Sequence, residues 1–154
     1  MPHLAALDVL TNCICISLAT RLIISGLHRT LIRPDLVIVQ VVQYKPESKH
    51  TFGMYLDGKW YKLTAKEGTF DESDPVDRLD VSILQNNCIT PIFGISDPRT
   101  DKRIDFVGGI RGLSELERRC SEDMEIAFSM YPTSLAELMA IADSGRVMPP
   151  KSTW

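Results

Sequence analysis

The loop over residues 108–112, Gly-Gly-Ile-Arg-Gly, has the composition of an anion-binding loop. It lies between an apolar run over 104–107 and a helical pattern over 113–120. The free N–H groups and the dipole at a helix N-terminus favour anions, and Arg111 adds a planar fork of donors. The tail over 149–153 contributes one lysine and two hydroxyls. The sequence therefore predicts a site for a phosphate-like group, formed by Gly108, Gly109, Arg111, Lys151, Ser152 and Thr153.

Three strands and two helices are expected to position these loops. The strands are predicted over 104–107, 126–130 and 147–148, with helices beginning near Leu113 and at Ser134. This order indicates a βαβαβ unit with a small, mainly parallel sheet, in which the first two strands are parallel neighbours. Open α/β sheets bind ligands at the carboxyl ends of their strands. We therefore expect Arg111 and Lys151 to approach each other there.

The glycine pattern itself is not specific to nucleotide binding. Gly-Gly-x-x-Gly is neither the dinucleotide fingerprint nor a P-loop, since no Gly-Lys-Ser/Thr follows it. The alternative interpretation is that Gly108 and Gly109 form a tight turn and that Arg111 is solvated. Both interpretations stay open at the level of the sequence.

Other residues could carry chemistry, each with a simpler alternative. His50 could act as an acid or base, although a lone histidine that opens a strand is more often structural. Asp97, Asp101 and Asp105 could hold a metal, but the arginines and lysine among them favour a solvated turn with local ion pairs. The four cysteines have no zinc spacing and are expected to be reduced and mostly buried. No metal ligands are assigned.

The preceding region predicts a hairpin and a helix. Two β-type runs over 50–64 are joined by Asp57-Gly58, which favours a type I′ turn. Asp74-Pro75 has the order of an N-cap followed by a first-turn proline, and predicts a helix start. Ser134 and Glu137 have the spacing of a capping box. The helix that follows is expected to bury Leu135, Leu138, Met139 and Ala142.

Composition limits the class of protein. The chain has 154 residues, 44% of them hydrophobic, which fits one globular domain. A net charge of -3 argues against a general nucleic-acid surface, since that needs a basic stripe. No apolar run reaches the roughly 18 residues of a membrane span, and no positive charge precedes the run over 9–20 as in a signal peptide. We therefore expect a cytoplasmic protein without a membrane contact; a homo-oligomer remains open.

Several stretches together resemble one family. The stretches over 49–61, 79–85, 97–105 and 148–154 are similar to the bacterial and archaeal family named domain of unknown function 1015. The resemblance covers about residues 44–154 and suggests the C-terminal portion of members that are more than twice this length. Family members also carry an upstream Asp-Gly-His-His-Arg motif, similar to that of ParB-like and sulfiredoxin-like proteins that include free-serine kinases. The nearest match here, residues 25–29, lacks the Asp and one His.

The resemblance implies a function and its cofactors. It implies a phosphotransfer enzyme acting on a small anionic metabolite such as serine or phosphoserine, with ATP or ADP and Mg²⁺ in the full-length family. This chain would supply the anion-binding part and is expected to be inactive alone. The alternative is a ParB-like binding or structural module without catalysis. The acidic balance of the chain counts against DNA as its partner.

Residues 1–43 form an atypical apolar segment. Their pattern fits neither helix nor strand cleanly, and the resemblance begins at Tyr44. We interpret the segment as non-native, from an out-of-frame translation or a fusion, ahead of an α/β domain over 44–154. It is then expected to make few contacts with the core, so that a chain beginning at Tyr44 would be at least as stable.

Overall fold

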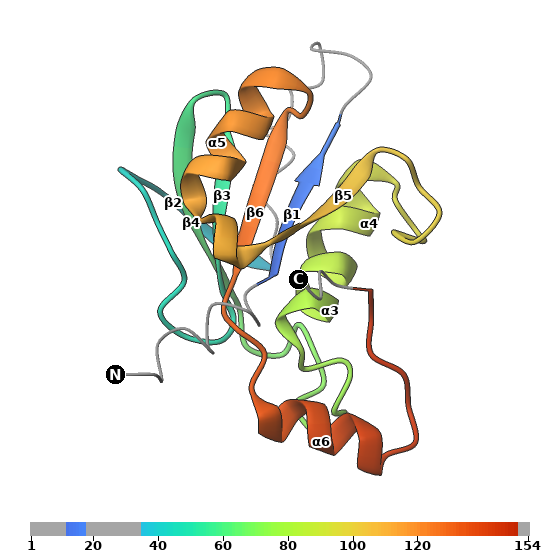
Figure 1. Ribbon diagram of the computed structural model, residues 1–154. Helices are drawn as coiled ribbons and strands as arrows, with labels where there is room; N and C mark the ends of the chain where they lie inside the picture. The colour runs from blue at the N-terminus through green and yellow to red at the C-terminus, as the bar shows by residue number, and fades with distance from the viewer. Residues whose placement is uncertain (1–11, 18–34, 151–154) are drawn as a thin grey trace, which may run out of the picture.

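The computed structural model describes residues 12–17 and 35–150, and it has an α+β fold (Figure 1). Six strands form one sheet in the order β2-β4-β3-β6-β1-β5. The strands are β1 (Asn12–Ile16), β2 (Leu36–Val41), β3 (Thr51–Leu56), β4 (Lys59–Ala65), β5 (Ile104–Gly108) and β6 (Ile126–Met130). The helices are α3 (Asp80–Leu84), η1 (Gln85–Ile89), α4 (Thr90–Phe93), η2 (Gly109–Arg111), α5 (Leu113–Glu122) and α6 (Leu135–Asp143).

The sheet is antiparallel, so the predicted mainly parallel sheet is wrong. Each pairing between the described strands is antiparallel. β5 and β6 do run in the same direction, because both pair antiparallel to β1, but β1 lies between them. The sequence predicted that β5 and β6 are neighbours because they follow each other along the chain with one helix between them. The prediction failed because the local pattern does not indicate that β1, from a distant segment, inserts between them. Residues 147–148 are not a strand.

The β3–β4 hairpin is confirmed. Asp57 and Gly58 connect the strands with φ values of 50° and 73°. Positive φ at both central residues is the geometry of a type I′ turn, whose twist matches that of the flanking strands. The register places Leu56 opposite Lys59 and Tyr55 opposite Trp60.

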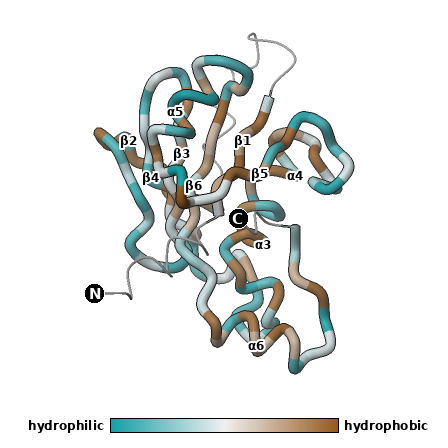
Figure 2. Tube along the Cα trace, in the orientation of Figure 1, coloured by the Kyte–Doolittle hydropathy of each residue, from teal (hydrophilic) through white to brown (hydrophobic). Residues whose placement is uncertain are grey.

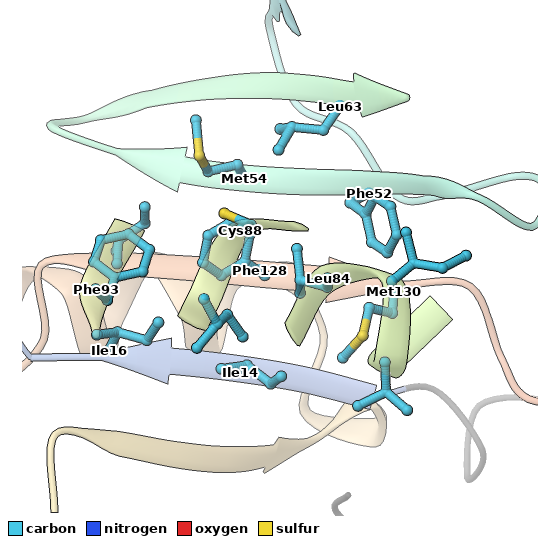
Figure 3. Close-up of a cluster of buried hydrophobic side chains, with 14 of the residues drawn as sticks. Ile14, Ile16, Phe52, Met54, Leu63, Leu84, Cys88, Phe93, Phe128 and Met130 are labelled. Atoms are coloured by element: carbon cyan, nitrogen blue, oxygen red, sulfur yellow. The ribbon is translucent and has the colours of Figure 1, made fainter. Parts of the chain in front are cut away.

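Two layers of helix cover the two faces of the sheet (Figure 1). The α3–η1–α4 segment packs on one face, where buried side chains of the strands and of this segment form the main core (Figure 3). α5, largely hydrophilic in Figure 2, covers the other face through Leu116. The indole Nε1 of Trp60 donates to Glu117 Oε1 at 2.7 Å and ties α5 to the sheet. The helix that was predicted to begin near Leu113 is confirmed, because α5 spans Leu113–Glu122.

Two helix predictions need correction. Asp74 caps a turn, since its Oδ1 accepts from the N–H groups of Val76 and Asp77, but the α-helix begins only at Asp80. In α6, the capping box of Ser134 and Glu137 is confirmed. The predicted apolar stripe is wrong, because Leu135 and Met139 are 68% and 57% exposed. α6 lies beyond the end of the sheet (Figure 1), so a narrower face of the helix is buried than the pattern predicts.

The expectation that residues 1–43 make few core contacts is wrong for the part that the structure describes. β1 lies inside the sheet with a partner on each side. Ile14 and Ile16 join the main core, while Cys13 and Cys15 face the α5 side. β2 pairs with β4 along its length. A chain beginning at Tyr44 would lose both strands and leave β5 and β6 without their shared partner; the origin of the segment stays a prediction.

Candidate functional site

A polar pocket lies at one end of the sheet, where three distant segments meet. It has a volume of about 370 Å³ and is lined by Lys49, His50, Glu72, Arg78, Ser134, Ala136 and Glu137. Lys49 and His50 precede β3, Arg78 precedes α3, and Ser134 to Glu137 begin α6. Beside it lies a second space of about 10 Å³, which we call the inner cavity. Asp80, Tyr131, Pro132 and Thr133 help to line it.

His50 holds an uncommon backbone conformation at this corner. Its φ is 65°, in the left-handed region that side-chain-bearing residues seldom adopt. Two hydrogen bonds keep it there: its N–H donates to Asp80 Oδ1 at 2.9 Å, and its carbonyl accepts from the Ala65 N–H at 3.0 Å. The imidazole lies 4.5 Å from the Phe70 ring, centroid to centroid. The backbone of His50 is thereby fastened while its side chain lines the pocket.

Asp80 is a buried carboxyl group with one oxygen unpaired. Its Oδ1 accepts from His50, but Oδ2 is buried and has no hydrogen-bond partner in the structure. Burial raises the pKa of Asp80 to about 7, and the nearby Glu137 carboxylate acts in the same direction. The His50 N–H and the Lys49 ammonium oppose this shift in the pKa without cancelling it. Asp80 can therefore exchange a proton near neutral pH.

Glu137 organises the opposite wall. Its Oε2 accepts from the backbone N–H of Ser134 at 2.8 Å and from the Ser134 hydroxyl at 2.9 Å. Its Oε1 lies 2.9 Å from Lys49 Nζ in an ion pair. Burial raises the pKa of Glu137, but the hydrogen bonds from Lys49 and Ser134 outweigh it and hold the pKa below its ordinary value. Glu137 is therefore ionised at neutral pH and fixes the Lys49 ammonium at the pocket.

Arg78 is a cation of the pocket that has no partner among the residues that the structure describes. Within the described ranges, no ion pair or side-chain hydrogen bond engages its guanidinium, although it lines the pocket. By contrast, Arg99, Arg103, Arg118 and Arg119 are all paired with carboxylates. An unpaired guanidinium beside a lysine and a histidine can accept the bidentate contact of a phosphate or carboxylate.

The loop over 108–112, which was predicted to form part of an anion site, contains a short helix. Gly109 to Arg111 form the short helix η2 after Gly108, and Gly112 has a φ of 75° at the start of α5. The Arg111 side chain is 66% exposed, with Nη1 3.5 Å from Glu115 Oε1. Lys151, Ser152 and Thr153 lie outside the described residues, so their approach to Arg111 stays a prediction. Of the predicted site residues that the structure describes, it is His50 that lines the pocket.

The three aspartates that were considered as metal ligands form ion pairs with arginines. Asp97 pairs with Arg99 and Asp101 with Arg103, which are the local ion pairs of a solvated turn. Asp105 pairs with Arg119 of α5. In residues 12–17 and 35–150, no group of three or more His, Cys, Asp or Glu side chains is arranged to hold a metal. The same residues contain no helix that is long and apolar enough to cross a membrane.

Sequence reasoning missed Lys49, Arg78, Asp80 and Glu137 as site residues. Lys49 and Asp80 lie in two of the stretches that carry the family resemblance, and this was the signal that could have found them. Glu137 was recognised only as part of a capping box. Nothing in the local pattern indicates that His50, which precedes β3, and Asp80, the first residue of α3, contact each other.

Comparison with known proteins identifies a family. The model of the family described as "Protein of unknown function (DUF1015)" matches residues 9–82. The match confirms the resemblance to that family over slightly less than half of the chain, and it does not reach the stretches over 97–105 and 148–154. The match overlaps the stretch from Tyr44 and also reaches back over most of the segment that was interpreted as foreign to the family. No curated protein and no solved structure matches the chain.

Proposed function

We propose that this chain binds a small anionic metabolite in the pocket between β3, α3 and α6, as the binding part of a phosphotransfer enzyme. The observation that carries the proposal is the unpaired Arg78 guanidinium beside Lys49 and His50. A guanidinium without a carboxylate partner is free to form two parallel hydrogen bonds with an incoming anion. A volume of about 370 Å³ suits a small metabolite.

The charges of the pocket favour a ligand that carries both signs. Glu72 and Glu137 line the same space as the three basic side chains. Such a mixed lining supports serine or phosphoserine over a nucleic-acid backbone, which presents anionic groups alone. The pairing of Arg99, Arg103, Arg118 and Arg119 with carboxylates also counts against a ParB-like DNA surface.

The phosphotransfer step would need more than these residues. The resemblance implies ATP or ADP with Mg²⁺, yet the described residues do not group the carboxylates that would hold the metal. The chain's own contribution is therefore binding and orientation of the anionic group. We expect it to bind ligand without turning it over when it is alone.

Titration calorimetry with inorganic phosphate and phosphoserine tests this proposal. Arg78→Gln should weaken both by about tenfold, because a charge-assisted bidentate contact is lost. Arg111→Gln is the matched control, since this guanidinium is mostly exposed and lies near Glu115. It should leave both affinities unchanged.

Three results would count against the proposal. Equal losses in the two variants would show that the pocket is not the anion site. A loss confined to Arg111→Gln would return the site to the loop over 108–112. Stabilisation of the chain by duplex DNA and not by phosphoserine would favour the binding-module alternative.

A further inference from the structure

The inner cavity adjoins the main pocket and shares two residues with it. Lys49 and Glu137 line both spaces, so their ion pair lies where the two meet. The inner cavity measures about 10 Å³, which is the space for a single water-sized group. It therefore has room for one small polar group and not for a whole metabolite.

Asp80 places a hydrogen-bond acceptor without a donor at this cavity. Its Oδ2 is buried without a donor, and a buried carboxylate oxygen left unpaired is costly. The His50 N–H binds Oδ1 and the Lys49 ammonium pairs with Glu137. The Tyr131 and Thr133 hydroxyls that line the cavity do not bind Oδ2 either. Pro132, which also lines the cavity, has no N–H to offer. A donor on a molecule that enters the cavity would satisfy this oxygen.

We propose that the inner cavity is a subsite for a hydrogen-bond donor of the ligand, an ammonium or a hydroxyl group, which binds Asp80 Oδ2 while the anionic group of the same ligand lies on Arg78. This inference rests on the proposed function and narrows it. The ligand class is a small phosphate or carboxylate that also carries an amino or hydroxyl group.

The pH dependence of binding should follow Asp80. Its pKa is raised to about 7 by burial, and the charged side chains that face it are Lys49 and Glu137, with the Tyr131 phenol also lining the cavity. An ammonium group binds the ionised carboxyl group better than the protonated one. Its contribution to affinity should therefore be present above about pH 7 and decline as Asp80 takes up a proton below it.

Three probes that differ only at the donor position test the subsite. They are ethyl phosphate, 2-hydroxyethyl phosphate and phosphoethanolamine, titrated against the full chain at about pH 8. Phosphoethanolamine should bind about tenfold more tightly than ethyl phosphate, with the hydroxyl probe between them. At about pH 6 this ratio should fall, and the same comparison in Asp80→Asn, which has no carboxyl group to titrate at this position, corrects for the different titration of the phosphates.

Asp80→Asn is the matched variant, since it keeps the shape of the side chain and an oxygen for the His50 N–H. It should bring the three affinities together without weakening ethyl phosphate. Arg78→Gln should weaken all three probes and preserve their order. An unaltered melting temperature of the variant, or a raised one, shows that the fold is kept.

The outcomes separate the two proposals. If ethyl phosphate binds through Arg78 but the three probes are equal in the unmodified chain, the subsite is wrong and the anion site stands. If the preference for the amine survives in Asp80→Asn, the donor binds elsewhere and the subsite is wrong. If none of the probes binds, the anion site fails and the subsite fails with it.

Discussion

β1 and the corner around Asp80 differ in how well their buried groups are packed and paired. In β1, Ile14 and Ile16 are 1% and 0% exposed, and the strand pairs with a neighbour on each side. At the corner, a carboxyl oxygen is buried without a donor, a histidine has positive φ, and an arginine has no partner within residues 12–17 and 35–150. The first arrangement stabilises the fold, whereas the second costs free energy.

The difference indicates where function lies. Burial of apolar side chains against paired strands is explained by stability alone. An unpaired buried carboxylate next to a strained backbone is not, and such costs gather at binding and catalytic sites. We therefore expect mutations in the two regions to change stability in opposite directions.

Ile14→Ala should have the largest effect on stability. It removes a fully buried side chain from an inner strand of the sheet and should lower the free energy of unfolding by about 2–5 kcal/mol. Denaturant unfolding followed by circular dichroism measures the loss. The control is Val39→Ala on the edge strand β2, where the side chain is 54% exposed and the change should stay within about 0.5 kcal/mol. Equal losses would contradict the central role of β1.

Gly53→Ala should have the next largest effect. A Cβ at this position would lie 2.4 Å from Ser129 Oγ and 2.5 Å from the Tyr44 carbonyl oxygen, so β3 or its neighbours would have to shift. We expect a loss of about 1–3 kcal/mol in the free energy of unfolding. Adding Ser129→Gly should restore part of it by removing one of the two clashes. No recovery in the double variant would mean that the Tyr44 backbone contact alone decides the cost.

Asp80→Asn should have the smallest effect on stability, and with the opposite sign. Because the pKa is raised to about 7 in the folded chain, the folded state binds the proton more tightly than the unfolded state does. The stabilising contribution of the protonated form is complete below the unfolded pKa of about 4 and is lost as the pH rises through about 7. The variant should therefore melt higher than the unmodified chain at about pH 8 and not at about pH 4.

Asp97→Asn is the control for this comparison. Its hydrogen bonds with the Arg99 side chain lower the pKa of Asp97, so its ionised form favours the folded state. Removing that charge should produce no gain in melting temperature at about pH 8. A gain in Asp97→Asn equal to that in Asp80→Asn would point to net charge, and not burial, as the cause.

Local patterns in the sequence were sufficient for elements that neighbouring residues specify. Asp57-Gly58 predicts the type I′ hairpin because the turn depends on residues that accept positive φ. Ser134 and Glu137 predict the start of α6 because a capping box is a contact over three residues. The helix after Leu113 follows from its spacing of apolar residues in the same way.

The order of the strands and the location of the pocket were decided only by the tertiary structure. β1 pairs with strands about ninety and more residues away, and no local signal states that partner, so β5 and β6 were wrongly expected to be neighbours. The contact of Asp80 with His50 likewise joins residues that are 30 positions apart. Its raised pKa results from burial by the whole fold, since an aspartate in the extended chain would be solvated and ordinary.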